Sequence, residues 1–480
     1  MIPAWRGTFE VQTTARAKLV VSADGRGVVS HAGSRLLADL ADRTTLTGEL
    51  TEALGQLGRP RTVHGPGRVL VDLAVAVADG AGCISDIAVL ADQPALFGPV
   101  ASDSTVWRLL DQLGEQELAA VAAARATARE VAWGQRAEVT GAAVPAAAVA
   151  GVELPGLVID TDASIVVCHS EKESAAATFK SSFGYHPILA FLDNSGEFLA
   201  GLLRPGNAGA NTAADHISVL DAALAQLPDA HRHGIPLLVR ADGAGCSKAF
   251  LAHIRGLRDQ AVLTEFTVGW AVTDRERTAI DTLPDTAWTD AIDADGQPRA
   301  GAHVAELTGL LPSGTLTDYP AGTRVLVRRE RPHPGAQLDA FEERDGWRYQ
   351  CFTTDTQLGQ LAFLDARHRA HARVEDRIRT GKDTGLGRFP SRTFTINAAW
   401  LTAVMLAVDL LAWAQTILLH DHPALRRAEP KTLRYRLLHV AGRLAHGGRR
   451  LRLRLDRHWP WAVALAAAFD RCAALPQPAR

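Results

Sequence analysis

Acidic residues in three separate segments of the chain have the spacing expected of a shared catalytic site. Asp160 and Asp162 lie two residues apart in an apolar segment, so in a β-strand their side chains point to the same face. Asp242 closes a second apolar run, and Glu375 follows in a segment with helical spacing. If the two strands are neighbours and the helix crosses their ends, the carboxylates meet at one edge of a sheet.

Such a cluster needs a counter-charge. At an effective dielectric constant of about 20, two carboxylates about 4 Å apart repel by about 4 kcal/mol, so without a cation one is driven towards protonation. All-oxygen ligands suit Mg²⁺ or Mn²⁺. Two such ions would activate a water or a 3′-hydroxyl and stabilise the leaving oxygen of a phosphodiester. The alternative is that Asp160 caps an element or lies at the surface, Asp242 begins a turn, and Glu375 belongs to a solvated helix face.

The segment around Glu375 carries further ionisable groups. One helix face holds His368, His371 and Glu375 at positions i, i+3 and i+7, and Lys382 follows. A zinc site is one interpretation of the two histidines and Glu375, but the H-E-x-x-H pattern is absent and nearby arginines disfavour a dication. An arginine-rich helix face suits phosphate contacts better. The arginines in question are Arg369, Arg373, Arg377 and Arg379.

The elements that must position these residues begin near residue 156. Strands are predicted at 157–167, 186–193, 197–207, 235–242 and 261–268, with helices at 212–227 and 247–258. Three antiparallel strands followed by strand–helix alternation indicate an α/β fold, a mixed sheet covered by helices, in which the first and fourth strands are neighbours. A strand at 347–355 returns to this sheet, and helices at 358–380 and 400–419 follow.

These patterns divide the chain into five regions. Residues 1–150 are mainly helical, with helical periodicity over 35–57 and 69–77 and a helix predicted over 104–126, and are a candidate for DNA binding or dimerisation. The catalytic domain takes its first part from 151–268 and its second from 346–420. Residues 269–345, rich in proline and acids and with one clear strand at 323–330, form a β-rich insertion subdomain. Residues 421–480 are a basic C-terminal region.

Composition and charge restrict the class of protein. Of 480 residues, 47% are hydrophobic and 22% charged, which indicates a folded globular chain. The five cysteines are widely spaced and form no C-x-x-C, which suits a reducing cytosol. No signal peptide is predicted at the start.

The net charge of −2 conceals an asymmetry. Residues 366–480 hold 21 Arg and Lys against 8 Asp and Glu, and residues 1–365 hold 30 against 45. A basic C-terminal quarter indicates an anionic polymer as partner. Its arginines alternate like a strand or a one-sided basic segment suited to a DNA backbone: Arg449, Arg450, Arg452, Arg454 and Arg457.

One apolar stretch could be mistaken for a membrane span. Residues 398–414 are 17 in number and are interrupted by Thr402 and Asp409. A bilayer needs about 20 apolar residues, so the segment is predicted to be a buried helix, and no membrane association is expected.

Several blocks of sequence together resemble the DDE transposases of bacterial insertion sequences. They are VIDTDASIVVCHSEKESAAATFKSSFGYHPILAFLD, LLRPGNAGANTAADHISVLDAAL, LVRADGAGCSKAFLAHI and HARVEDRIRTGKDTGLGRFPSRTF, with GRVLVDLAVAVADGAGCISDIAVL nearer the N-terminus. The chain is most similar to the insertion sequence 1380 family, within the insertion sequence 4-like superfamily. The resemblance covers most of the chain.

The resemblance implies a ribonuclease H-like fold with a β-rich insertion between the second Asp and the Glu. It implies a catalytic and metal-binding triad of Asp162, Asp242 and Glu375, with Asp160 as the alternate first carboxylate. The superfamily signature Y-x2-R-x3-E-x6-K matches here at Glu375 and Lys382. The two histidines of that helix stand at its Tyr and Arg positions, a departure from the signature.

The implied activity is cleavage at the element's terminal inverted repeats with Mg²⁺ or Mn²⁺, followed by attack of the freed 3′-hydroxyl on target DNA. Lys382, with Arg369, Arg373 and Arg379, would contact DNA. A homodimer in the paired-end complex and a cytoplasmic, nucleoid-associated location in bacteria are expected. The alternatives are a ribonuclease H-like nuclease that cuts without joining and a transposase-derived DNA-binding protein without chemistry.

Overall fold

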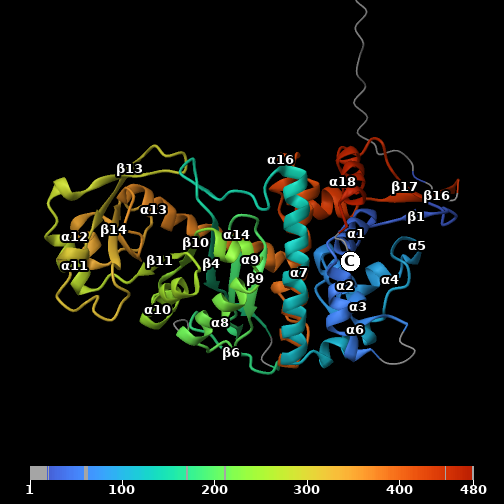
Figure 1. The fold of residues 1–480 in the computed structure, drawn as a ribbon, viewed down its shortest axis with the longest axis horizontal. Helices are drawn as coiled ribbons and strands as arrows, with labels where there is room; N and C mark the ends of the chain where they lie inside the picture. The colour runs from blue at the N-terminus through green and yellow to red at the C-terminus, as the bar shows by residue number, and fades with distance from the viewer. Residues whose placement is uncertain are drawn as a thin grey trace, which may run out of the picture.

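The computed structural model describes residues 19, 21–58, 63–168, 171–209, 212–448 and 450–477. It is elongated, with a large mixed sheet and its helices on one side and a helical bundle on the other (Figure 1). The long helix α7 (Glu115–Thr140) stands between the two parts. This arrangement separates the predicted carboxylate cluster from the N-terminal and C-terminal regions.

A nine-stranded mixed sheet forms the centre of the α/β part. Its order is β12-β13-β14-β15-β11-β10-β4-β8-β9. β4 pairs in parallel with β10, which confirms that the first and fourth predicted strands are neighbours. The strands run from β4 (Leu157–Ala163), β8 (Ile188–Leu192), β9 (Phe198–Leu202), β10 (Leu237–Ala241) and β11 (Thr264–Trp270) to β12 (Thr289–Ile292), β13 (Pro298–Glu306), β14 (Arg324–Glu330) and β15 (Arg348–Thr354).

Alternation along β4 decides which helices each side chain meets. Leu157 and Ile159 pack in one apolar core with α8 (Ala213–Leu224) and α10 (Lys248–Gly256). Val158 points to the opposite face, where it packs with Ala366 of α13 (Leu361–Arg369). Since side chains alternate along a strand, Asp160 and Asp162 share the face of Val158, and that face is covered by α13 and by α14 (Arg373–Gly381).

Residues 269–345 extend the central sheet. They supply β12, β13 and β14, and β14 pairs with β15 along its whole length. Two short helices, α11 (Asp274–Asp281) and α12 (Ala340–Asp345), accompany these strands. The sequence predicted only the strand corresponding to β14, because β12 and β13 are rich in polar and small residues and β13 begins at Pro298.

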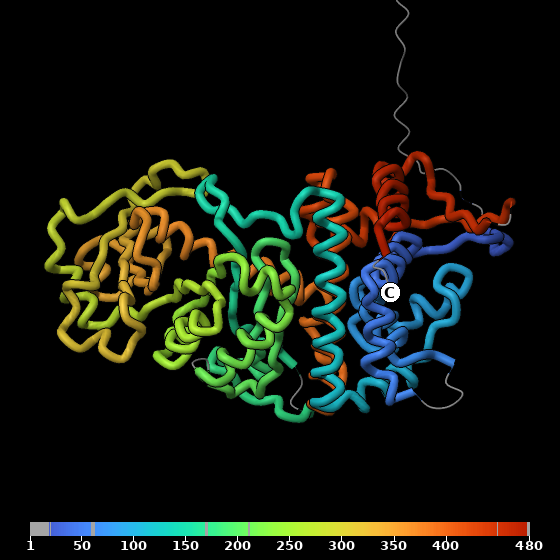
Figure 2. The backbone as a smooth tube through the Cα atoms, in the orientation of Figure 1, coloured from blue at the N-terminus to red at the C-terminus, as the bar shows by residue number. Residues whose placement is uncertain are grey.

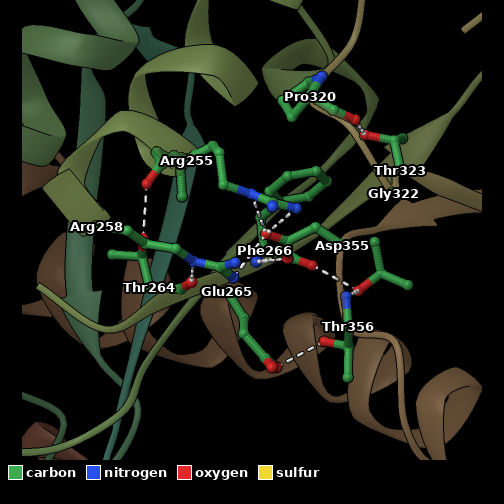
Figure 3. A network of polar contacts seen from close by, with 12 residues as sticks. Arg255, Arg258, Thr264, Glu265, Phe266, Pro320, Gly322, Thr323, Asp355 and Thr356 are labelled. Atoms are coloured by element: carbon green, nitrogen blue, oxygen red, sulfur yellow. Dashed lines mark hydrogen bonds and ion pairs between the residues drawn. The ribbon is translucent and has the colours of Figure 1, made fainter.

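A polar network fastens the end of β15 to the rest of the sheet (Figure 3). The buried Asp355 accepts hydrogen bonds from Arg255 at 3.1 Å, Arg258 at 2.9 Å and the Phe266 amide at 2.9 Å. Thr356 donates to Glu265 at 2.6 Å. The chain is thereby held where it leaves the sheet and enters α13, the element that precedes Glu375.

The N-terminal helices differ from the sequence prediction at two breaks. A single helix over 35–57 was expected, but Thr45 at φ 62° separates α1 (Arg35–Arg43) from α2 (Leu46–Ala53). The helix expected at 104–126 is divided between α6 (Asp103–Gln112) and α7, with Gly114 between them. Neither break interrupts the apolar periodicity, which is why the pattern alone did not locate them.

The C-terminal region returns to the N-terminal helices. One continuous core includes Leu36 of α1, Leu73 of α3 (Pro66–Asp79), residues of α15 (Phe394–Trp413) and Leu465 of α18 (Ala462–Ala474). The strand β1 (Val28–Val29) also pairs with β16 (Gly442–Gly447). Figure 2 shows the two ends of the described chain side by side. Residues far apart in sequence therefore form one hydrophobic core.

Helix α15 was predicted as buried despite its hydropathy, and this is confirmed. In the described residues, one helix, Phe394–Leu418, is long and apolar enough to cross a membrane, and 94% of its most apolar window is buried inside the protein. A bent pair of N-terminal helices passes the same test only if counted as one span. Asp409 of α15 is fully buried and accepts from Arg125 at 2.8 Å and Arg129 at 2.5 Å. Arg129 also bonds Glu197 at 2.9 Å, so these side chains tie α7, α15 and the β8–β9 hairpin together.

A second polar cluster joins the N-terminal helices to the C-terminal region. Asp79, at the end of α3, lies 2.6 Å from His31 Nδ1, and His439 Nε2 lies 2.8 Å from its carbonyl oxygen and 3.3 Å from its carboxylate. Burial alone would raise the pKa of Asp79, but hydrogen bonds from both histidines and from Ser34 hold it below its usual value. The hydrogen bond to Asp79 raises the pKa of His439, against burial and Arg434.

This cluster predicts a pH dependence of stability. Because folding raises the pKa of His439, its contribution is complete below about 6.5, its unfolded value, and is lost as the pH rises through the folded value. The urea midpoint should fall between pH 6 and 9, by an amount equivalent to less than about 1 kcal/mol since the histidine is partly exposed. His439→Gln should flatten this part of the profile. An equal slope in the variant would contradict the assignment.

Candidate functional site

The carboxylates of Asp162 and Asp242 emerge at the same end of two paired strands. In the parallel ladder Ala241 lies opposite Thr161, so the next residue of each strand is an aspartate. Asp242 caps a short helical turn and accepts the Ala244 amide at 3.0 Å. Asp162 accepts the Ala163 amide at 2.7 Å. Each carboxylate therefore keeps oxygen lone pairs free for another ligand.

Glu375 approaches these aspartates from α14. Glu375, Asp242 and His371 line one cavity of about 930 Å³ that opens towards β14 and β15. Burial, followed by the charge of Asp242 and with a smaller effect of Glu375, raises the pKa of Asp162 to about 6. Glu375 therefore raises the pKa of Asp162 together with Asp242, although more than 130 residues separate Asp242 from Glu375 in the sequence.

Asp160 has different surroundings from Asp162. It is fully buried and accepts from Arg240 Nε and Nη2, both at 2.7 Å, and lies 2.9 Å from His371 Nδ1. Burial would raise the pKa of Asp160, but Arg240 and His371 lower it. Arg240 also lies 2.8 Å from Asp193, which completes a buried ionic network. Sequence reasoning missed the partner role of Arg240, since only its position opposite Asp160 in the β4–β10 register reveals it.

The three other carboxylates have no such cation. Within the described ranges, no Lys, Arg or His lies within 4.0 Å of a carboxylate oxygen of Asp162, Asp242 or Glu375. Their oxygen atoms also lie further from one another than the ligand atoms of a closed metal site would. In the same part of the chain, three ligand atoms approach within 4.8 Å of one another only at His31, Asp79 and His439. The carboxylates therefore form an open, negatively charged cluster.

The zinc interpretation of His368, His371 and Glu375 does not hold. His368 stacks on Phe352, with ring centroids 4.6 Å apart, and its Nδ1 lies 3.1 Å from the Thr267 hydroxyl. Burial and neighbouring cations lower its pKa to about 3. His371 is held by Asp160, as described above. The two histidines thus pack β11, β15 and β4 against the helix and do not converge with Glu375 on one ion.

The predicted DNA-contacting side chains lie around the cluster with partners of their own. Lys382 Nζ donates to the Ile165 carbonyl at 3.1 Å, and burial lowers its pKa while Asp162 opposes this. The arginine partners are Asp365 and the Ile292 carbonyl for Arg369, Asp193 and the Ala148 carbonyl for Arg373, and Asp376 and Glu429 for Arg379. Lys382 is the member of this group whose pKa is influenced by the charge of Asp162. Arg299 and Arg328 line the cavity as well and were not predicted, since they arrive on strands of the inserted region.

The chain was matched against curated proteins and solved structures. No curated protein matches the chain. One similar solved structure is the cryo-electron microscopy structure of the piggyBac transposase synaptic complex with hairpin DNA. It is 8% identical over 87% of this chain and 83% of that one, with a TM-score of 0.41, too low to support an argument.

A family match extends over nearly the whole sequence. Residues 11–477 match the family described as transposase DDE domain, group 1. The protein therefore belongs to the group 1 family of transposase DDE domains.

Proposed function

We propose that this protein is an insertion-sequence transposase that cleaves DNA at the element's terminal inverted repeats and joins the freed 3′-hydroxyl to target DNA. The observation that carries the proposal is the position of Asp162 and Asp242 at the same ends of β4 and β10, with Glu375 on the helix that crosses them. Strand order β9-β8-β4-β10-β11 supports a ribonuclease H-like domain: β8 is antiparallel to both of its neighbours, β4 and β9, while β10 and β11 are parallel to β4.

The donor set fits divalent metal ions. Among the described residues no protein cation pairs with these three carboxylates, and burial followed by the charge of Asp242 raises the pKa of Asp162, which shows that its negative charge is costly there. Hard oxygen ligands suit Mg²⁺ or Mn²⁺. We infer that Asp162, Asp242 and Glu375 would hold two such ions, which would polarise the attacking and leaving oxygens of the phosphodiester. Asp160 does not fit this role, because Arg240 pairs with its carboxylate and His371 also contacts it.

The remaining residues of the site bind and orient. Lys382 follows Glu375 on the same helix and lies at the edge of the cluster near Asp162, where its ammonium would contact a DNA phosphate. Arg299 and Arg328 line the cavity beside the carboxylates and would contact the same strand. The Asp160–Arg240 pair keeps β4 and β10 in register, and this register places Asp162 beside Asp242. A homodimer that holds two element ends completes the proposal.

The proposal is tested by incubating the full chain with duplexes that carry the element's own ends. With Mg²⁺, we expect nicking at the end and a joined product with target DNA, and with Ca²⁺ we expect binding without either. Cutting without joining would replace the transposase proposal with a nuclease. Binding without cutting in Mg²⁺ would leave only a DNA-binding role.

The two aspartates of β4 should respond in opposite ways to substitution. Asp160→Ala leaves Arg240 buried with one carboxylate partner fewer, and breaking a buried pair costs about 3 kcal/mol or more. Asp162→Ala removes a carboxylate that other carboxylates repel, so the free energy of unfolding should change by less than about 1 kcal/mol while cleavage is lost. Urea unfolding and the cleavage assay on both variants separate the roles. A stable, inactive Asp160→Ala would assign catalysis to Asp160 instead.

A further inference from the structure

A small sheet at the other end of the molecule carries a concentration of arginines. β1, β16 and β17 (Arg450–Leu455) form a three-stranded antiparallel sheet. Along β17, Leu453 and Leu455 pack against the hydrophobic core, whereas Arg450, Arg452 and Arg454 alternate with them and are exposed. The alternation predicted from sequence is therefore a strand with one apolar and one basic face. Arg449 of the same prediction lies outside the described residues.

The register of the hairpin places like charges side by side. Arg443 of β16 lies directly opposite Arg454 of β17, while Arg450 and Arg452 lie opposite Gly447 and Ala445. Like charges directly opposite each other destabilise a sheet. In the part of the chain that the structure describes, no acidic side chain lies within 4.0 Å of the basic groups of these four arginines. We call Arg443, Arg450, Arg452 and Arg454 the basic sheet face.

The basic sheet face borders a hollow. A cavity of about 840 Å³ is lined by Arg443 and Arg454 together with Arg26, Val28 and Pro94, and Asp92 contributes its one carboxylate. The residues opposite the arginines in the hairpin, Gly447 and Ala445, are small. A polyanion can therefore approach the strands closely, beside the guanidinium groups of β17.

The location of this face determines what it can bind. Figure 1 shows β16 and β17 beside the N-terminal helices, across α7 from the sheet that carries Asp162 and Asp242. A phosphate at the carboxylate cluster cannot be the one that this face contacts. We propose that the basic sheet face binds the phosphate backbone of the element's end at a distance from the cleaved bond, on the inner part of the terminal repeat. This inference rests on the proposed function, which supplies DNA as the polyanion.

Arginine suits this role because its planar guanidinium binds phosphate oxygens in a bidentate manner. The contacts follow the backbone and not the base edges, so they set the position of the DNA without specifying its sequence. Each phosphate contact adds about 0.9 to the slope of log K against log salt, a factor of about 8 in affinity at 0.1 M relative to 1 M salt. Two arginines should together contribute about 60-fold.

The test compares the wild-type chain with Arg452→Ala/Arg454→Ala on two duplexes without divalent metal. One duplex carries the whole terminal repeat with its inner flank, and the other carries only the outer tip. We expect the variant to bind the long duplex about 60-fold more weakly at 0.1 M salt, with a salt slope smaller by about 1.8, and to bind the tip as the wild type does. The urea midpoint should be unchanged or higher, because the variant relieves repulsion with Arg443.

A matched control removes the same charge elsewhere. Arg108 and Arg344 are exposed, and Arg108→Ala/Arg344→Ala should change affinity for the long duplex by less than about twofold. Equal loss in the control would reduce the effect to net charge and overturn the proposal. So would wild-type affinity in the Arg452→Ala/Arg454→Ala chain, equal loss on both duplexes, or binding of anionic vesicles in place of DNA. Since no arm requires cleavage, failure of the catalytic proposal would be seen separately in the Mg²⁺ assay.

Discussion

Glu375→Gln should abolish Mg²⁺-dependent cleavage of the element's ends, with a loss of at least about 10³-fold. The substitution keeps the shape of the side chain and removes one of three ligand charges. Metal ions contribute several kilocalories per mole to stabilisation of the transition state, and about 1.4 kcal/mol corresponds to tenfold in rate. Glu375 is exposed and has no ion pair among the described residues, so the fold should be unaffected. The measurement is single-turnover nicking of an end duplex, beside a binding assay in Ca²⁺.

The neighbouring Asp376 provides the matched control. It is also exposed and lies on the same helix, but it pairs with Arg379 at 2.9 Å and does not line the cavity. Asp376→Asn should therefore retain cleavage within a few-fold of wild type. If both variants lose activity to the same extent, the helix as a whole and not the Glu375 carboxylate matters. Cleavage retained in Glu375→Gln would remove this residue from the triad.

Asp409→Ala should be the most destabilising single substitution in the helical part of the protein. It leaves Arg125 fully buried without its carboxylate and deprives Arg129 of one of two. Removing one partner of a buried ion pair costs about 3–5 kcal/mol, a large share of the 5–15 kcal/mol by which a typical domain is stable. Urea unfolding followed by circular dichroism should show the midpoint fall sharply, and little soluble protein is expected at 37 °C.

Two further variants distinguish the buried charge from the loss of volume. Arg125→Met/Asp409→Leu removes an opposite pair together and should recover much of the lost stability, because apolar replacements of buried ion pairs are often neutral or stabilising. Asp421→Ala breaks an exposed pair with Arg471 and should cost less than about 1 kcal/mol. A double variant as unstable as Asp409→Ala would show that packing, and not the unpaired arginine, causes the defect.

Local patterns were sufficient to predict which strands and helix carry the proposed metal-binding carboxylates. The two-residue spacing of Asp160 and Asp162 fixes a shared face, and the continuous apolar run before Asp242 identifies a strand buried on both sides. Both features depend only on neighbouring residues. The pairing of β4 with β10 follows from the order of strands and helices, which explains why the mixed sheet was predicted correctly.

Features that depend on register could not be predicted. Asp160 and Asp162 share a strand and a face, and the register distinguishes them because Arg240 lies opposite Asp160. Likewise, β13 reads as polar because its first half, from Pro298, is exposed or half-buried, and its buried residues Ala302, Val304 and Ala305 are confined to the second half. The joining of β1 to β16 links residues more than 400 positions apart, and no local signal records it.

The core that the N-terminal helices share with α15 and α18 determines how late during synthesis the chain can finish folding. The apolar faces of α1 and α3 pack against α15 and α18, so they stay uncovered until the ribosome has completed residue 475 or so. At about 5–20 residues per second, the interval between the emergence of α7 and that of α18 is roughly 20–70 s. During this time the N-terminal helices cannot complete their packing. A message cut short before α18 would therefore yield a chain with exposed helices, which is a substrate for chaperones and proteases and not a partly active enzyme.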